Sequence, residues 1–206
     1  MSRELILGMS VSLDGFVAGP NGEIDWVFRN SIPASALWLA DQLEQIGLIA
    51  MGHRSYQGMA DFWPTSPSPF AKSMNEKPKA VFSKSGTIAV PAMVPTMAAL
   101  EAGNVSAEVV DSWRNPHVAG ANLVDDINAL KAMEGGPINA LGGASFASSL
   151  IAADLVDVFR LAVYPVALGR GIPIFADLES PLDLKLVDLV KFDSGVMVKT
   201  FRPAGK

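Results

Sequence analysis

Apolar residues along the chain follow two alternating patterns: short continuous runs, and longer stretches in which they recur three or four positions apart. Continuous runs rich in branched residues predict buried strands, and they lie at 5–12, 46–52, 79–83 and 155–168. The wider spacing predicts helices at 35–45, directly after Gly52, and at 123–133. The run INAL before Gly142 continues the sheet, and a small helix is expected from about Ala144.

Two stretches depart from this alternation. Up to about residue 120, the chain after the third strand is expected to be mostly loop, with one short strand at AEVVD (107–111). Near the C-terminus, Leu182, Leu184 and Leu186 alternate with charged residues, and the FDSGVM turn leads into VMVKTFR, which predicts an antiparallel hairpin. Repeated β-α-β crossovers that end in a hairpin predict an α/β fold, with helices on both faces of a mixed, mostly parallel central sheet.

Composition narrows the class of protein. The chain has 206 residues, half of them hydrophobic, and no long linker or repeat, so we expect a single domain over 1–206. A net charge of -5 provides no basic surface for nucleic acid or an anionic membrane. The lack of cysteine excludes disulfides and thiolate metal sites, and two histidines do not make a zinc site. The first residues carry no signal-peptide or membrane pattern, and we expect a cytoplasmic protein.

Two junctions between a strand and a helix carry the candidate chemistry, MGHRSY and LGGASF. A helix N-terminus exposes unpaired N–H groups, and glycine lets a backbone approach an anion closely. At the first junction His53, Arg54 and Ser55 add side-chain donors that suit a phosphomonoester. At the second, Gly142 and Gly143 leave only backbone donors, which suit a pyrophosphate. Together the junctions predict a dinucleotide with an extra phosphate.

Each junction also has a plainer interpretation. A glycine pair after a strand is often a tight turn that allows close packing of helix and sheet. His53 and Arg54 can equally be the solvated start of a helix. The chain contains neither the G-x-G-x-x-G fingerprint after its first strand nor a G-x-x-x-x-G-K-[ST] loop, so a dinucleotide would require another fold.

Five blocks of sequence, in order, are typical of one superfamily: SLDGFVAGPNGEIDW, MGHRSYQGMADFWP, KPKAVFSKSGT, LGGASFASSLIAADLVD and VYPVALGRGIPIF. From about residue 4 to 202 the chain resembles the dihydrofolate reductase-like superfamily. Within it, the chain is similar to stand-alone homologues of the C-terminal reductase domain of the bifunctional riboflavin-biosynthesis deaminase-reductase. This resemblance implies the three-layer dihydrofolate reductase-like fold and an NADPH-dependent oxidoreductase.

The resemblance also implies which residues bind NADPH. Those expected to hold the adenosine-side phosphates are Gly52, His53, Arg54 and Ser55. Those expected to flank the 2′-phosphate or the adenine are Ser83 and Lys84. Those expected to cradle the pyrophosphate are Gly142, Gly143, Ala144 and Ser145. The loop 18–26 takes the place of the mobile loop that covers the nicotinamide, where closure would exclude water.

On the substrate side, the resemblance implies Asp14 as the catalytic residue, beside the reacting sugar or in a proton relay, although an Asp-Gly pair often caps a turn instead. Arg170 is the expected donor to a substrate phosphate, or else a solvated turn residue. Trp26 is expected in the substrate cleft or in the core. Two positions depart from the family patterns: Ser35 and Leu141 stand where dihydrofolate reductases and riboflavin reductases, respectively, carry acidic residues.

The implied reaction is hydride transfer to C1 of an opened ribosylamino group, as in a 5-amino-6-(5-phosphoribosylamino)uracil reductase. Alternatives are a dihydrofolate or pterin reductase, a regulatory protein that binds NADPH without turnover, and a scaffold without ligand. Deamination is excluded because the zinc deaminases need cysteine ligands that the chain lacks. The expected partners are a small-molecule substrate and a second copy of the chain, because members of this group commonly pair through sheet edges or hairpins.

Overall fold

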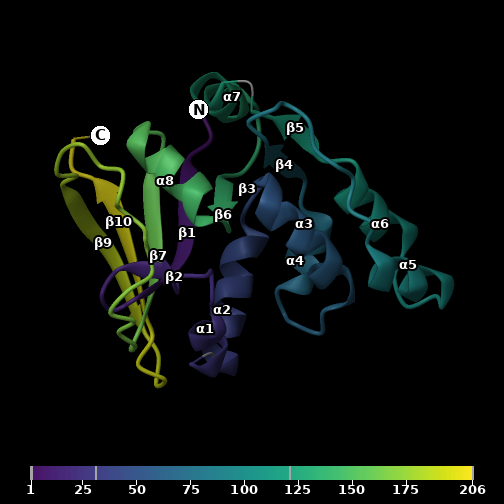
Figure 1. Ribbon diagram of the computed structural model, residues 1–206, viewed down its shortest axis with the longest axis horizontal. Helices are drawn as coiled ribbons and strands as arrows, with labels where there is room; N and C mark the ends of the chain where they lie inside the picture. The colour runs from purple at the N-terminus through teal and green to yellow at the C-terminus, as the bar shows by residue number, and fades with distance from the viewer. Residues whose placement is uncertain (1, 31, 121, 206) are drawn as a thin grey trace. The chain divides into compact units, whose positions relative to one another are not determined.

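The computed structural model describes residues 2–30, 32–120 and 122–205, and it shows the predicted alternation of strands and helices (Figure 1). The strands are β1 (Leu5–Ser12), β2 (Phe16–Ala18), β3 (Leu48–Gly52), β4 (Lys79–Phe82), β5 (His117–Ala119), β6 (Ile138–Leu141), β7 (Val158–Tyr164), β8 (Ile172–Pro173), β9 (Leu184–Lys191) and β10 (Met197–Pro203). The helices are α1 (Asp25–Arg29), α2 (Pro33–Glu44), α3 (His53–Phe62), α4 (Ala71–Glu76), α5 (Val94–Glu101), α6 (Ala107–Arg114), α7 (Leu123–Ala132) and α8 (Ala144–Ala152), with a 3-10 turn at η1 (Trp63–Thr65).

Most predicted elements are confirmed. The predicted strands correspond to β1, β3, β4, β6 and β7, the predicted helices to α2, α3, α7 and α8, and the predicted hairpin to β9 and β10. The result is an α/β fold with a mostly parallel sheet and C-terminal antiparallel strands. In the part of the chain that the structure describes, none of the helices has the length and apolar character that a membrane crossing requires.

The stretch 107–111, predicted as a strand, is instead the beginning of helix α6, so this prediction was wrong. Ser106 is the N-cap, and its hydroxyl accepts a hydrogen bond from the Val109 N–H at 3.5 Å. Val110 and Trp113 lie three positions apart and are both buried, which is helical spacing. The five-residue window ended before Trp113, so it showed only the branched residues. Helix α5 also lies in the region expected to be mostly loop.

The chain divides into two compact units, and the expectation of one domain over 1–206 stays a prediction. The first unit comprises residues 1–3 and 37–139. In it, β3, β4 and β5 are parallel neighbours, and their register places Gly52, Phe82 and Ala119 in one row. The loops that follow these three residues therefore leave the sheet at the same edge, because the strands run in the same direction.

A buried cation supports the opposite end of β4 in the first unit. The Lys79 side chain is 2% exposed, and its Nζ donates hydrogen bonds to the Lys77 carbonyl at 2.9 Å, the Ser112 hydroxyl at 3.1 Å and the Asn75 carbonyl at 3.3 Å. The same Nζ lies 4.4 Å from the centre of the Trp113 ring. Burial lowers the pKa of Lys79 to about 7. One ammonium thus links α4, β4 and α6.

The second unit comprises residues 4–36 and 140–206. Its strands follow the order β1-β7-β10-β9, in which β1 and β7 are parallel while β10 is antiparallel to both β7 and β9 (Figure 1). Strands β2 and β8 form a separate two-stranded ribbon. This ribbon joins the chain that follows β1 to the chain that follows β7, so it brings two loops of the second unit together.

Candidate functional site

The junction between β3 and α3 has the features of an anion site. Gly52 is the N-cap of the ten-residue helix α3, and no side chain of the described residues caps its N–H groups. His53 is half-buried, and its Nε2 is a buried atom that has no hydrogen-bond partner among the described residues. Arg54 is exposed and Ser55 half-exposed on the same first turn. Among the described residues, the amides have no side-chain cap and the imidazole nitrogen has no partner, and together with the exposed guanidinium they suit an oxyanion ligand.

The loop after β4 leaves the sheet at the same edge. Ser83 is buried, and its N–H donates to the Ala119 carbonyl at 2.9 Å, while Lys84 is exposed. The hydroxyl oxygens of Ser83 and Ser85 lie 3.0 Å apart. The structure therefore brings the predicted residues Ser83 and Lys84 to the edge where Arg54 also lies.

Gly120 was missed by the sequence analysis, although it completes this edge. It follows β5 directly, its φ is +133°, and a Cβ placed on it would overlap the backbone of Ser83. Its N–H donates to the Asp126 carboxylate at 2.7 Å, which fixes the start of the next segment. The signal that could have revealed it is a single glycine directly after the short run HVA, which forms β5.

The junction between β6 and α8 is built differently. Gly142 and Gly143 have φ angles of +70° and +82°, a region that residues with a Cβ rarely adopt. Gly143 is the N-cap of α8, and in the part of the chain that the structure describes no side chain caps this helix either. Ala144 is half-exposed and Ser145 exposed at the start of the helix. The glycine pair thus turns the chain sharply and leaves a helix N-terminus without a competing side chain.

Asp14, the predicted catalytic residue, uses its carboxylate to hold a neighbouring loop. Oδ2 accepts hydrogen bonds from the Gly169 N–H at 2.7 Å and the Leu168 N–H at 3.0 Å, and Oδ1 accepts one from the Ser12 hydroxyl at 2.6 Å. The Ser12 bond and the two amides lower the pKa of Asp14 to about 2. This arrangement favours a structural role over proton transfer, although Asp14 holds a loop 154 positions away and not the turn that follows it, the capping role that the sequence left open.

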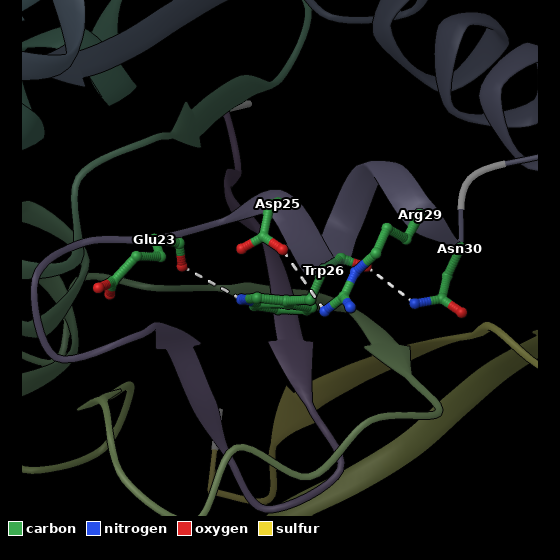
Figure 2. A network of polar contacts seen from close by, with 5 residues as sticks. All are labelled: Glu23, Asp25, Trp26, Arg29 and Asn30. Carbon is green, nitrogen blue, oxygen red and sulfur yellow. Dashed lines mark hydrogen bonds and ion pairs between the residues drawn. The ribbon is translucent and has the colours of Figure 1, made fainter.

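Trp26, the predicted substrate residue, lies in the core. It is 1% exposed, and its ring meets Tyr164 edge-on with ring centres 5.3 Å apart. Figure 2 shows its Nε1 donating to the Glu23 carbonyl at 3.2 Å, and the Asn30 side-chain amide donating to the Trp26 carbonyl at 2.8 Å. Trp26 therefore anchors the loop 18–26 to helix α1, and its burial favours the core alternative.

Arg170 is exposed on the loop after β7, which fits both a substrate-phosphate donor and a solvated turn residue, so its role stays a prediction. Its positive charge acts on the other loop of the second unit: hydrogen bonds from Asn21 lower the pKa of the Glu23 carboxyl, and the charge of Arg170 adds to that effect. The guanidinium therefore lies close enough to Glu23 for its charge to act on that carboxyl.

The two positions that depart from the family patterns, Ser35 and Leu141, both lie in regular elements. Ser35 is 4% exposed, and its hydroxyl donates to the Ile32 carbonyl at 2.9 Å, so it stabilises the start of α2. Leu141 is the half-buried last residue of β6. Among the described residues no group of three or more histidines and carboxylates is placed to hold a metal ion.

Comparison with known families and proteins agrees with this geometry. The model of the RibD C-terminal domain matches residues 3–198. The uncharacterized protein YyaP of Bacillus subtilis (strain 168) is 32% identical over 200 residues, which cover 95% of this chain and 92% of YyaP. The chain belongs to the RibD C-terminal domain family. The domain that defines this family is a reductase domain, which supports the assignment of the chain as an oxidoreductase.

Solved structures show the same fold. A protein from Shewanella sp. PV-4 named for riboflavin biosynthesis has a TM-score of 0.71 at 21% identity, with 98% of this chain and 99% of that one covered. A Thermotoga maritima diaminohydroxyphosphoribosylaminopyrimidine deaminase/5-amino-6-(5-phosphoribosylamino)uracil reductase has a TM-score of 0.67 at 14% identity, with 98% and 57% covered. Enterococcus faecalis dihydrofolate reductase, in a complex with NADP(H), has a TM-score of 0.59 at 14% identity, with 99% of both chains covered. The fold is therefore dihydrofolate reductase-like.

Proposed function

We propose that the protein is an NADPH-dependent reductase of the 5-amino-6-(5-phosphoribosylamino)uracil reductase type. The observation that carries the cofactor assignment is the β3–α3 junction, where an uncapped helix N-terminus is combined with the unpaired Nε2 of His53 and the exposed Arg54. These donors match a phosphate in number and charge. Membership of a reductase family and a dihydrofolate reductase neighbour solved with NADP(H) support the same assignment.

The cationic side chains and the backbone amides suit different phosphate groups of NADPH. In the first unit, Arg54 and Lys84 are cations at one edge of the sheet, and they would hold the 2′-phosphate that distinguishes NADPH from NADH. In the second unit, the positive φ angles of Gly142 and Gly143 expose backbone amides that would hold a pyrophosphate. When bound, NADPH supplies the hydride.

Arg170 supports the proposed phosphoribosylamino-pyrimidine substrate. Its guanidinium is exposed between two glycines, and it would hold the phosphate of a phosphoribosylamino-pyrimidine. The product of such a reduction is the ribitylamino pyrimidine phosphate. Ser35 supplies no carboxyl group for protonating a pteridine, so a dihydrofolate or pterin substrate is the less supported alternative.

Calorimetric titration with NADPH and NADH tests the cofactor assignment. We expect the wild type to bind NADPH more tightly, by about tenfold or more, because a charge-assisted hydrogen bond is worth about 1.5–3 kcal/mol. Arg54→Ala should abolish the preference, whereas Arg114→Ala, which removes an exposed arginine of α6 in the same unit, should retain it. If neither nucleotide binds, the glycines serve packing alone.

A regulatory protein that binds NADPH without turnover is the second candidate, because Ser35 and Leu141 replace acidic residues of the related enzymes. It predicts the same NADPH binding but no loss of NADPH absorbance with the phosphoribosylamino-pyrimidine or with dihydrofolate. Oxidation of NADPH by the first substrate would exclude this candidate.

We also propose that two copies of the chain pair through β9, and that the protein works in the cytoplasm. Strand β9 ends the strand order of the second unit, and its Leu186, Val187 and Leu189 side chains are each about half exposed. A long apolar edge strand offers unpaired backbone groups to a second strand. Light scattering after size-exclusion chromatography should give twice 21.8 kDa; the mass of one chain would contradict the dimer.

A further inference from the structure

The carboxylate of Asp14 lies at the centre of a network that fixes the loop after β7. Besides its bonds to Leu168 and Gly169, it is oriented by the Ser12 hydroxyl, which also accepts the Phe16 N–H at 2.9 Å. Ser12 is 1% exposed, so the orienting group is itself held in the core. The two Asp14 oxygens accept four hydrogen bonds from three donors, the Ser12 hydroxyl and the Leu168 and Gly169 amides, so they are fully occupied by Ser12 and this loop.

Further backbone contacts hold the same loop at both ends. The Leu13 N–H donates to the Val166 carbonyl at 2.7 Å, before the residues that Asp14 holds. After them, the Ile174 N–H donates to the Gly15 carbonyl at 3.2 Å. Asp14 therefore holds the middle of a segment whose ends are already fixed by hydrogen bonds.

Arg170 lies between two glycines that this network fixes. On one side, Gly169 has a φ of +73°, and its N–H points to Asp14. On the other side, a Cβ on Gly171 would overlap the Ala18 carbonyl, so Gly171 packs directly against β2. The backbone on both sides of Arg170 is thus set, and the direction in which its side chain leaves the loop depends on the Asp14 contact.

We propose that Asp14 is a positioning residue, which directs Arg170 to the phosphate of a phosphorylated sugar substrate and does not itself transfer a proton. This inference rests on the proposed function, because it deepens the role of Arg170 there. A proton carrier needs a free oxygen facing the reacting atoms, whereas the Asp14 oxygens face two amides and a hydroxyl. Its low pKa also leaves no proton to donate at neutral pH.

The experiment uses 15N-labelled full-length protein with ribose 5-phosphate as the probe, in wild type, Asp14→Asn, Arg170→Ala and Asp14→Asn/Arg170→Ala. Amide exchange of Leu168 and Gly169 should accelerate at least tenfold in Asp14→Asn, because an amide group keeps only one acceptor oxygen. The control is Asp25→Asn, which removes an exposed carboxylate of helix α1 and should change neither amide. Gly169→Ala disturbs the loop from the other side and should reproduce the Asp14→Asn result.

Binding measurements separate positioning from loss of structure. Ribose 5-phosphate should bind about tenfold more weakly to Asp14→Asn, and the double variant should bind no more weakly than Arg170→Ala alone. NADPH affinity should be unchanged in Asp14→Asn, whereas a general loss of structure would weaken both ligands. Unchanged amide exchange, additive losses in the double variant, or no binding of ribose 5-phosphate to the wild type would each overturn the inference.

Kinetics distinguish positioning from proton transfer. With the phosphoribosylamino-pyrimidine as substrate, Asp14→Asn should raise KM and leave kcat and its pH profile unchanged. A fall in kcat with an altered pH profile and an unchanged KM would overturn the positioning role. If wild type binds NADPH but oxidises none, the proposed function fails at turnover, while the exchange and ribose 5-phosphate results still decide the role of Asp14.

Discussion

The β3–α3 and β6–α8 junctions each place a helix N-terminus directly after a strand, but they differ in backbone conformation and in their side chains. Gly52 begins α3 with φ and ψ of −73° and 151°, an extended conformation that any residue can adopt. Gly142 and Gly143 both have positive φ angles before α8, and there glycine is required. The first junction adds His53 and Arg54, whereas the second adds no charged side chain.

This difference separates two ways of recognising an anion. A junction with cationic side chains can distinguish ligands by the number of their charges, since each cation contributes its own charge-assisted bond. A junction made of backbone fits any group that reaches its amides, and it depends on the chain having no Cβ there. Substitution should therefore change selectivity at the first junction and total affinity at the second.

The units also differ in the charge that supports each loop. In the first unit, the buried Lys79 ammonium donates hydrogen bonds to three oxygen atoms and so links α4 to α6. In the second, the exposed Asp14 carboxylate holds two amides. Burial of the Lys79 ammonium carries a desolvation free energy, which moves its pKa close to neutrality and makes the stability of the fold depend on pH there. The Asp14 carboxylate, held by amides, is ionised throughout that range.

The largest effect is expected from Gly143→Val. At φ +82° a β-branched residue is strained by about 1–2 kcal/mol, and its side chain would cover the amides of α8. We expect NADPH and NADH affinities to fall together by about 100-fold, the loss of about 2.7 kcal/mol of binding free energy. Gly52→Ala is the comparison at the other junction, and because its extended backbone accepts a Cβ, calorimetric affinity should stay within about threefold.

Comparable losses in the two variants would remove the distinction between a backbone site and a side-chain site. A folded Gly143→Val protein with wild-type affinity for both nucleotides would show that α8 does not contact the cofactor. Circular dichroism and thermal unfolding of each variant establish that it is folded before titration.

A smaller effect is expected from Lys84→Ala. The exposed ammonium follows β4 at the edge where Arg54 lies, and the 2′-phosphate is absent from NADH. NADPH should bind about tenfold more weakly, a change of about 1.4 kcal/mol, and NADH should bind as before. Lys72→Ala, which removes an exposed lysine of α4, should affect neither nucleotide. Equal weakening of both nucleotides by Lys84→Ala would place Lys84 away from the 2′-phosphate.

The sequence predicted the fold wherever periodicity extends over several turns or a whole strand. Helices α2 and α7 and strands β1 and β7 each have enough residues to show their spacing. The prediction for helix α6 was wrong because the window from Ala107 to Asp111 contains two valines but not Trp113, the residue that shows which face is buried. Local spacing alone does not reveal a contact made outside the window.

Features of a single chain segment were easier to predict than contacts between segments. The glycine pair is explained by its own backbone angles, which follow from position between a strand and a helix. The bond from Leu168 to Asp14 joins residues 154 positions apart, and no spacing rule reports it. For the same reason Trp26 stayed ambiguous in the sequence, since its contact with Tyr164 is made only in the folded unit.

The smallest effect is expected from Lys79→Met, which tests the buried charge of the first unit. The folded pKa of about 7 lies below the ordinary value of 10.5, so the unfolded chain binds more protons between these values and wild-type stability rises with pH there. One pKa unit corresponds to about 1.4 kcal/mol, so denaturant unfolding at pH 7 and pH 8 should show a rise approaching 1 kcal/mol in wild type. Lys79→Met lacks this group and should lose the rise, whereas Lys72→Met should keep it. NADPH affinity should be unchanged, because Lys79 lies at the opposite end of β4 from Lys84. A pH-independent wild type would mean that the three hydrogen bonds and the Trp113 ring keep Lys79 protonated, so that both units would rest on permanently charged groups.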